Sequence, residues 1–304
     1  MCAENGRMKA TVGYEISTGP AFAGQESKGK YQDIYEESWR EVTMLSMQHA
    51  MLSVLINYNE NTNKIDTKHL AASVYPDAIR AYSGRREYSH FEESSDGKDV
   101  SYWSFPADMK HVTQEEVEER LQKTGHLSSC IRAAAIGEET HLEVFETYNQ
   151  HLPEEIYVGV KDHLIQDRVF DAFIREQIDC SGKYEDLFVV DGQVYDGKQI
   201  RSYIGEIEQY GIYYLAYELY ETMGITADQE WFDMQVQSAL QKEYSPELAE
   251  KIYRFMKLSP EIDGYIKTHD WTHLQDGPVK QRDYEEMYRK VLFCMLSERN
   301  VDRV

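Results

Sequence analysis

The stretch that decides the fold is PEEIYVGVKDHLIQDRVFDAFIREQID, residues 153–179. It opens with Pro153, which suits the first position of a helix, and its apolar residues recur at steps of three and four. The spacing predicts a long helix over about 153–178. His163 and Asp167 are four residues apart, so they share one face of that helix. Apolar residues lie on the same face, and we therefore expect the pair to point inward.

Most of the remaining chain also has helical periodicity. Helices are expected over about 31–55, 67–74, 113–124, 127–150, 199–223, 226–242, 245–257 and 280–298. The segment FVVDGQVY, 188–195, predicts a small β-hairpin because Asp191-Gly192 lies between apolar residues. Residues 81–110 are expected to form a long irregular loop. The patterns predict an all-α fold, with a flexible arm over 1–30, a single helical domain over 31–304 and one small hairpin.

Composition limits the classes of function. The 304 residues carry a formal net charge of -22, which repels the phosphates of nucleic acids and leaves them open only as a substrate. Such charge most simply serves solubility, although a basic protein partner also fits it. No stretch is apolar enough to cross a bilayer. The four scattered cysteines and the absence of an apolar leader predict a cytoplasmic protein, or a secreted one if a signal was trimmed.

Three further residues have side chains that suit a metal. His49 lies in an apolar helix, Asp77 follows a proline, and His90 stands between a serine and an aromatic residue. Each has an ordinary explanation: a core histidine, a helix-terminal turn and a surface-loop histidine. His163 and Asp167 have one too, a hydrogen bond on a helix surface. Taken together, the five supply imidazole and carboxylate ligands of the kind that zinc prefers.

Four sequence blocks resemble those of the zinc-dependent phospholipase C and S1/P1 nuclease superfamily, most closely its bacterial phospholipase-C-like branch. The blocks are His49, HLAASVYPD (69–77), SHF (89–91) and VGVKDHLIQD (158–167), in that order. The resemblance covers about residues 40–180. It implies the helical phospholipase-C/P1-nuclease fold and metal-dependent chemistry.

The resemblance also implies roles for individual residues. Asp77, His90, His163 and Asp167 match the four protein ligands of one zinc ion, and Asp167 would bridge to a second ion that His49 helps to bind. Two features of the family are absent from this sequence: an N-terminal tryptophan that binds metal and a later HxxxE helix. One or two zinc ions are therefore expected, rather than three.

These expectations favour a metal-dependent hydrolase of a phosphate ester, most simply a phosphodiester, whose substrate is a small molecule or a lipid. Asp77 is the expected catalytic carboxylate, because it could orient or deprotonate the attacking water. Arg80, Arg85 and Arg86 are candidates to hold the phosphate, with surface solvation as their ordinary role. The alternative function is a catalytically inactive, acidic helical binding protein that retains the scaffold.

Two other features leave their roles open. His269 and His273 in THDWTH have the spacing of a metal pair on a helix, but they also suit an aromatic turn. The tyrosine-rich helix 200–222 either packs its rings at a boundary or lines a pocket. Three acidic residues on that helix could replace a missing ligand: Glu206, Glu208 and Glu218.

Overall fold

A computed structural model describes residues 45–57, 65–92, 99–127, 140–178, 188–190 and 193–301. Its helices are α1 (Ser46–Asn57), α2 (Thr67–Ser73), α3 (Tyr75–Ser83), α4 (Arg86–Ser89), α5 (Gln114–Lys123), α7 (Thr140–Tyr148), α8 (Glu154–Gln177), α9 (Gly197–Met223), α10 (Gln229–Trp231), α11 (Gln237–Glu243), α12 (Pro246–Tyr253), α13 (Pro260–Thr268) and α14 (Gln281–Val301). The π-helical turn η3 (Phe232–Val236) and the 3-10 helix η4 (Trp271–Gln275) complete the helical part. The strands are β1 (Val100–Tyr102), β2 (Gly125–Leu127), β3 (Phe188–Val190) and β4 (Gln193–Tyr195).

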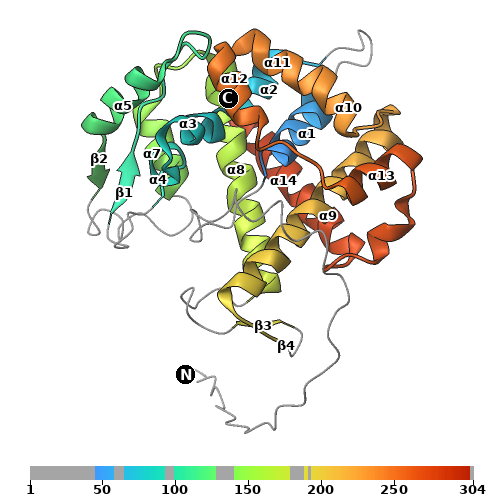
Figure 1. The fold of residues 1–304 in the computed structure, drawn as a ribbon. Helices are drawn as coiled ribbons and strands as arrows, with labels where there is room; N and C mark the ends of the chain where they lie inside the picture. Colours follow the sequence, from blue (N-terminus) through green and yellow to red (C-terminus); the bar gives the residue numbers. More distant parts are fainter. Residues whose placement is uncertain are drawn as a thin grey trace, which may run out of the picture. The chain divides into compact units, whose positions relative to one another are not determined.

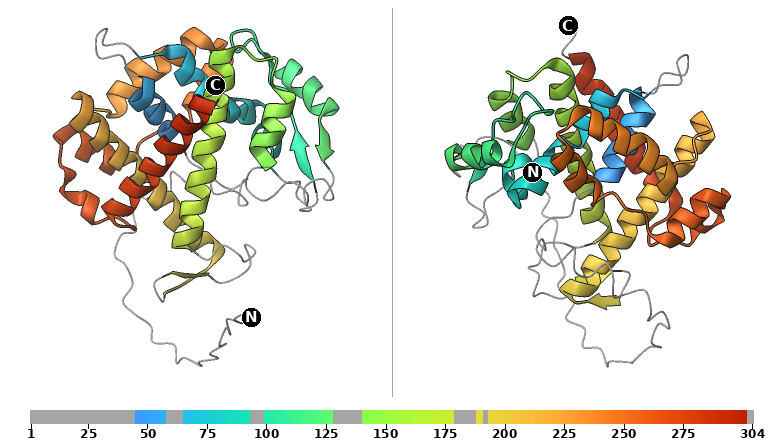
Figure 2. Two further views of the ribbon diagram at one scale, coloured as in Figure 1. Left: turned by 180° about the vertical axis from the view of Figure 1, so that it is seen from behind. Right: turned by 45° about the horizontal axis from the view of Figure 1, so that its top comes forward.

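Helix α8 is the element around which the described helices are arranged (Figure 1). It packs most closely against α2 and α14, while α1 packs against α2 and α9. Figure 2 shows α14 beside α8 when the molecule is seen from behind. Glu154 and Glu155 in the first turn and Arg175 in the last turn of α8 complement the helix dipole. Because α8 has neighbours on several sides, fourteen of its residues are buried, including polar ones.

The predicted all-α class with a small hairpin is confirmed. Strands β3 and β4 pair antiparallel where the hairpin was expected, and the predicted 199–223 helix is α9, which ends at Gly224 in the left-handed conformation. The proposed Asp191-Gly192 turn and the arm over 1–30 lie outside the described residues. The prediction of one irregular loop over 81–110 is wrong in part. This segment contains α4 and also β1, which pairs with β2.

The segment around Pro76 differs from the expected helix end. Helix α2 stops at Ser73, Val74 interrupts it, and Pro76 then lies in the first turn of α3. A proline is tolerated there because the first turn has no intrahelical partner for its missing N–H. Asp77 is therefore a first-turn residue of a new helix, and it is buried.

Gly159 allows α2 and α8 to approach each other closely. A Cβ atom at this position would stand 2.4 Å from Ala72 Cβ and 3.0 Å from the backbone of Ala72 and Ser73. We expect Gly159→Ala to lower the free energy of unfolding by about 1–3 kcal/mol, because this overpacking outweighs the higher helix propensity of alanine. Urea denaturation measures the change.

The matched control is Gly264→Ala in α13, where nothing lies within 4 Å of the added Cβ. This control is expected to be neutral or to stabilise the protein by up to about 1 kcal/mol. Equal effects of the two substitutions would show that the α2–α8 contact is not as tight as described.

Candidate metal centre

The five candidate ligands lie together in the protein interior, although they come from four different helices. His49 lies on α1, Asp77 in the first turn of α3, and His90 directly after α4. His163 and Asp167 lie one turn apart on α8. The three histidines are at most 1% exposed, and the two aspartates are 7% and 8% exposed. The ordinary explanation of His90 as a surface-loop residue is therefore wrong.

The ring nitrogens of His90 and His163 lie close to carboxylate oxygens of Asp77 and Asp167. His90 Nε2 lies 2.9 Å from His163 Nε2, 3.4 Å from Asp77 Oδ1 and 3.6 Å from Asp167 Oδ2. His163 Nε2 is 3.4 Å from the same oxygen of Asp167. Ligands on a tetrahedral zinc ion, each at about 2.0–2.1 Å, stand about 3.3–3.4 Å apart. The spacing of these donors therefore matches the edge of a tetrahedral coordination shell.

The outer nitrogens of two of these histidines are held by neighbouring groups. His163 Nδ1 donates to the backbone carbonyl of Ser73 at 2.7 Å, and His90 Nδ1 lies 2.8 Å from the hydroxyl of Ser89. A carbonyl can only accept, so neutral His163 carries its lone pair on Nε2 and aims it at His90. Metal-binding histidines are usually oriented by such partners. Two imidazole nitrogens this close need a proton or a cation between them.

His49 extends the site on the other side of Asp167. Its ring stacks on that of His163 with 3.7 Å between centroids, and its Nδ1 lies 2.5 Å from Gln166 Oε1. Its Nε2 is 3.2 Å from Asp167 Oδ1, without the direction of a hydrogen bond. His49 thus forms a second donor group with His163 and Asp167, which overlaps the first group of Asp77, His90 and His163.

Electrostatics keep both aspartates ionised. Burial alone would raise the pKa of Asp77, but a hydrogen bond from His90 and the charge of His163 outweigh it and hold this pKa well below its usual value. For Asp167, burial is likewise outweighed, here by the positive charge of Arg86 and then by that of His163. Burial, and then the charge of Arg86, lower the pKa of His90 to about 4. A neutral imidazole facing ionised carboxylates is the state in which these groups bind a cation.

Arg86 is the residue of this site that departs most from its expected surface role. It is 4% exposed, and its guanidinium donates to Asp167 Oδ2 and, at 2.6 Å, to Glu92 Oε1. Its Nη1 lies 3.9 Å from Asp77 Oδ1. Neighbouring Arg85 instead contacts the hydroxyl of Tyr88 near the surface. The sequence did not indicate which of the adjacent residues Arg85 and Arg86 would point into the interior.

A second polar network braces the helices that carry the ligands. His69 on α2 lies 2.9 Å from Asp162 on α8 through Nε2, and 2.7 Å from the hydroxyl of Ser53 on α1 through Nδ1. Ser53, His69 and Asp162 follow one another as the serine, histidine and aspartate of a hydrolytic triad do. All three residues are at most 5% exposed. Their role is to join α1, α2 and α8. His69 was not among the predicted site residues, because its segment has the pattern of an apolar helix.

Glu208 on α9 is a buried acid. It is 2% exposed, and its Oε1 is 3.8 Å from Arg201 Nη1 without a hydrogen bond. Burial raises its pKa to about 7, although the charges of Arg201 and Arg80 act in the opposite direction. Glu208 is one of the three acids that the sequence suggested as a replacement ligand. The negative charge of Asp167 acts on it from a distance and also raises its pKa.

The structure separates the THDWTH histidines. Helix α13 ends at Thr268, and His269 takes a left-handed backbone with φ of 53°, whereas His273 lies in η4. His269 Nε2 is 2.8 Å from the hydroxyl of Thr226, and His273 Nδ1 is 2.9 Å from Asp276. The pair therefore does not share a helix face.

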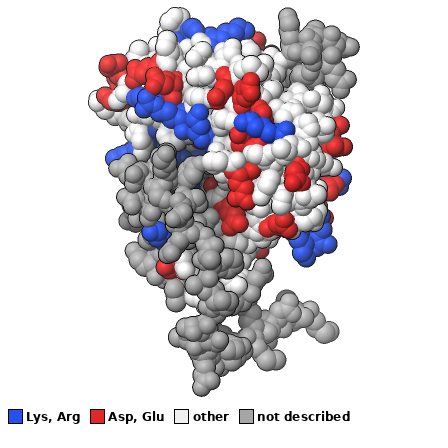
Figure 3. Space-filling view, turned by 45° about the vertical axis from the view of Figure 1, so that its right-hand side comes forward, with Lys and Arg blue, Asp and Glu red and all other residues white. Residues whose placement is uncertain are grey.

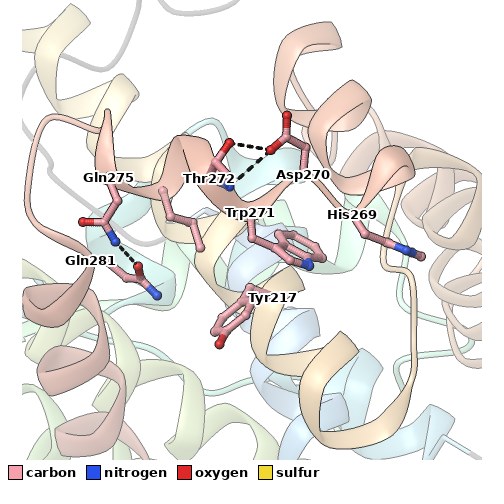
Figure 4. Close-up of a pocket in the computed structure, with 8 residues that line it drawn as sticks. Tyr217, His269, Asp270, Trp271, Thr272, Gln275 and Gln281 are labelled. Carbon is pink, nitrogen blue, oxygen red and sulfur yellow. Dashed lines mark hydrogen bonds between the residues drawn. The ribbon is translucent and has the colours of Figure 1, made fainter.

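A shallow pocket of about 430 Å³ lies beside these residues (Figure 4). In the close-up, Tyr217 of the tyrosine-rich helix lies below the indole of Trp271, while Asp270 turns away toward Thr272. Other tyrosines of this helix pack in the core, such as Tyr213 and Tyr214. The residues that line the pocket are Tyr217, His269, Asp270, Trp271, Thr272, Leu274, Gln275 and Gln281.

Comparison with family models, with curated proteins and with solved structures found no match to this chain. Among the described helices, none has the length and apolar character required to cross a membrane.

Proposed function

We propose that the protein is a metal-dependent hydrolase of a phosphate ester, most simply a phosphodiester, with zinc as the cation. The observation that carries the proposal is the buried group of Asp77, His90 and His163, whose donor atoms lie within 4.8 Å of one another, with Oδ2 of Asp167 3.6 Å from His90 and 3.4 Å from His163. The order of these residues in the sequence also resembles that of the phospholipase C and S1/P1 nuclease superfamily.

The residues present fit a divalent cation by their chemistry as well as their spacing. Imidazole nitrogens and ionised carboxylates are donors of the kind that zinc takes. The outer oxygen of Asp77 accepts from the hydroxyl of Ser46 at 2.6 Å, so this carboxylate is held in one orientation. Ionised carboxylates are costly to bury unless a positive charge compensates them, and a bound cation would lower that cost.

In this proposal each side chain has a distinct task. A bound zinc ion would lower the pKa of a coordinated water from about 16 toward about 7 and polarise a phosphoryl oxygen. Asp77, whose carboxylate stays ionised across the working pH range, orients the attacking water. The rings of His90 and His163 are held in position by Ser89 and by the backbone carbonyl of Ser73.

Removal of the metal tests the proposal directly. We expect the full-length protein to hydrolyse bis(p-nitrophenyl) phosphate, and treatment with a chelator to lower the rate by at least about tenfold. Adding back about one equivalent of zinc should restore the rate. The measurement is release of nitrophenolate, with the metal content determined on the same samples.

The alternative is a helical metal-binding protein without turnover, and one observation favours it. The side chains of Asp77 and Asp167 are only 8% and 10% exposed, and those of the histidines at most 1%. Catalytic zinc sites keep a position open for water or substrate, whereas structural sites are closed. Retention of zinc with no hydrolysis of any phosphate ester tried would overturn the enzyme and leave this alternative. Hydrolysis that is indifferent to the chelator would overturn the metal-dependent mechanism.

The surface charge limits the kinds of substrate and partner that the protein can bind. Figure 3 shows Asp and Glu side chains running down the centre of one face, with Lys and Arg mainly above and beside them. With a net charge of -22, a long polyanion would be repelled. We therefore propose a small-molecule or lipid ester as substrate; a basic protein is the partner expected of the non-catalytic alternative.

A further inference from the structure

Arg86 places a permanent positive charge against the carboxylates of the candidate metal centre. Its guanidinium lies within 4.0 Å of carboxylate oxygens of Asp77, Asp167 and Glu92. An arginine cannot lose its proton in a protein, so this charge is present at every working pH. We refer to these four residues, Arg86, Asp77, Asp167 and Glu92, as the Arg86 cluster.

We infer that Arg86 limits the centre to one divalent cation, by supplying beside Asp77 and Asp167 the charge that a second cation would otherwise bring. The inference rests on the proposed metal centre, and it goes beyond it by naming the residue that sets the number of ions. The sequence and its resemblance left one ion or two open.

The charge of the cluster supports a single ion. Three carboxylates and one guanidinium leave the cluster with a net charge of two negative units, which one divalent cation balances. A second divalent cation would leave two positive charges in excess among side chains that are almost entirely buried. Uncompensated buried charge is strongly unfavourable.

The donors also support a single ion. The group of His49, His163 and Asp167 and the group of Asp77, His90 and His163 both need Nε2 of His163. That nitrogen has one lone pair, and Nδ1 of the same ring is engaged by the carbonyl of Ser73. The two groups therefore cannot be complete at the same time. A second ion would therefore have only two ligands left in these groups, Nε2 of His49 and Oδ1 of Asp167.

Without Arg86, the balance changes. Three carboxylates then carry three negative charges, and two divalent cations leave an excess of only one positive charge. Oδ2 of Asp167 also loses the hydrogen bond from Arg86, so this oxygen could bridge two ions. We expect Arg86→Met to bind a second, weaker zinc ion, and Arg86→Lys, which keeps the charge, to bind one.

The experiment is a zinc titration of the full chain, followed by removal of free metal and measurement of ions per chain by mass spectrometry. The wild type and Arg86→Lys should saturate at about one ion and Arg86→Met at about two. Arg85→Met is the matched control, because Arg85 contacts Tyr88 rather than a carboxylate, and it should stay at one. A single ion in Arg86→Met would overturn the inference.

Two measurements on the wild type keep the test decisive if Arg86→Met does not fold. Two ions per wild-type chain would overturn the role of Arg86 while leaving the metal centre intact. No bound ion at all would instead refute the proposed centre. Manganese-loaded wild type should give the electron paramagnetic resonance spectrum of isolated ions, and the spectrum of a coupled pair would contradict a one-ion site.

Discussion

Substitution of His163 by alanine is expected to reduce zinc affinity by more than about 100-fold, since changes in the partners of metal ligands alone cost about 10–100-fold. His163 belongs to both three-residue donor groups among the described residues, so its loss leaves each group with two members. The protein should be purified with almost no zinc, and chelator-sensitive hydrolysis should disappear with it. Metal analysis and a competition titration with a chromophoric chelator measure the two effects.

The control for this substitution is His111→Ala. His111 is exposed and pairs only with Asp108 in the contacts that involve its ring, so its removal should leave the zinc content unchanged. Circular dichroism of both variants, recorded without metal, separates loss of a ligand from loss of fold. If His163→Ala retains zinc as tightly as the wild type, the assignment of the centre is wrong.

The second large effect concerns stability and pH. Burial raises the pKa of Glu208 from 4.5 to about 7, so the folded state keeps a proton that the unfolded state releases between these values. The unfolded state then binds fewer protons, and stability falls as pH rises through this window. At about 1.4 kcal/mol for each pKa unit, the full loss is on the order of 3 kcal/mol. Glu208→Gln should remove it.

Urea denaturation at pH 5 and pH 8, on samples of equal zinc content, checks this expectation. The variant should match the wild type at pH 5 and exceed it at pH 8. Glu221→Gln, an exposed position on the same helix, is the control and should leave the pH dependence unchanged. A variant that is equally destabilised at both pH values would show that the charge of Glu208 makes a favourable contact instead.

The helical part of the fold was predictable because it depends on local patterns. The periodicity of 153–178 predicted α8 to within a residue or two, and Gly224 ended α9 as its conformational freedom suggests. The turn at Pro76 was not predictable in the same way. Proline both ends and begins helices, and here the preceding helix stops at Ser73, so Pro76 lies in the first turn of α3.

The candidate centre was predictable by residue type and order, but not by its surroundings. Asp77, His90, His163 and Asp167 were singled out from the sequence, and their side chains lie close together in the structure. Arg86 and Glu208 could not be ranked above their neighbours. A side chain one position away points in a different direction, and only the packing of α4 and α9 decides which one is buried.

The sequence by itself determined the helix that carries His163 and Asp167 on one face, since that spacing is a property of a single helix. Tertiary structure alone decided what this face meets. It brought His90 within 2.9 Å of His163, and it turned Arg86 rather than Arg85 toward the carboxylates. The reason is physical: hydrogen bonding within the backbone sets a helix locally, whereas burial of charge depends on groups that are distant in sequence.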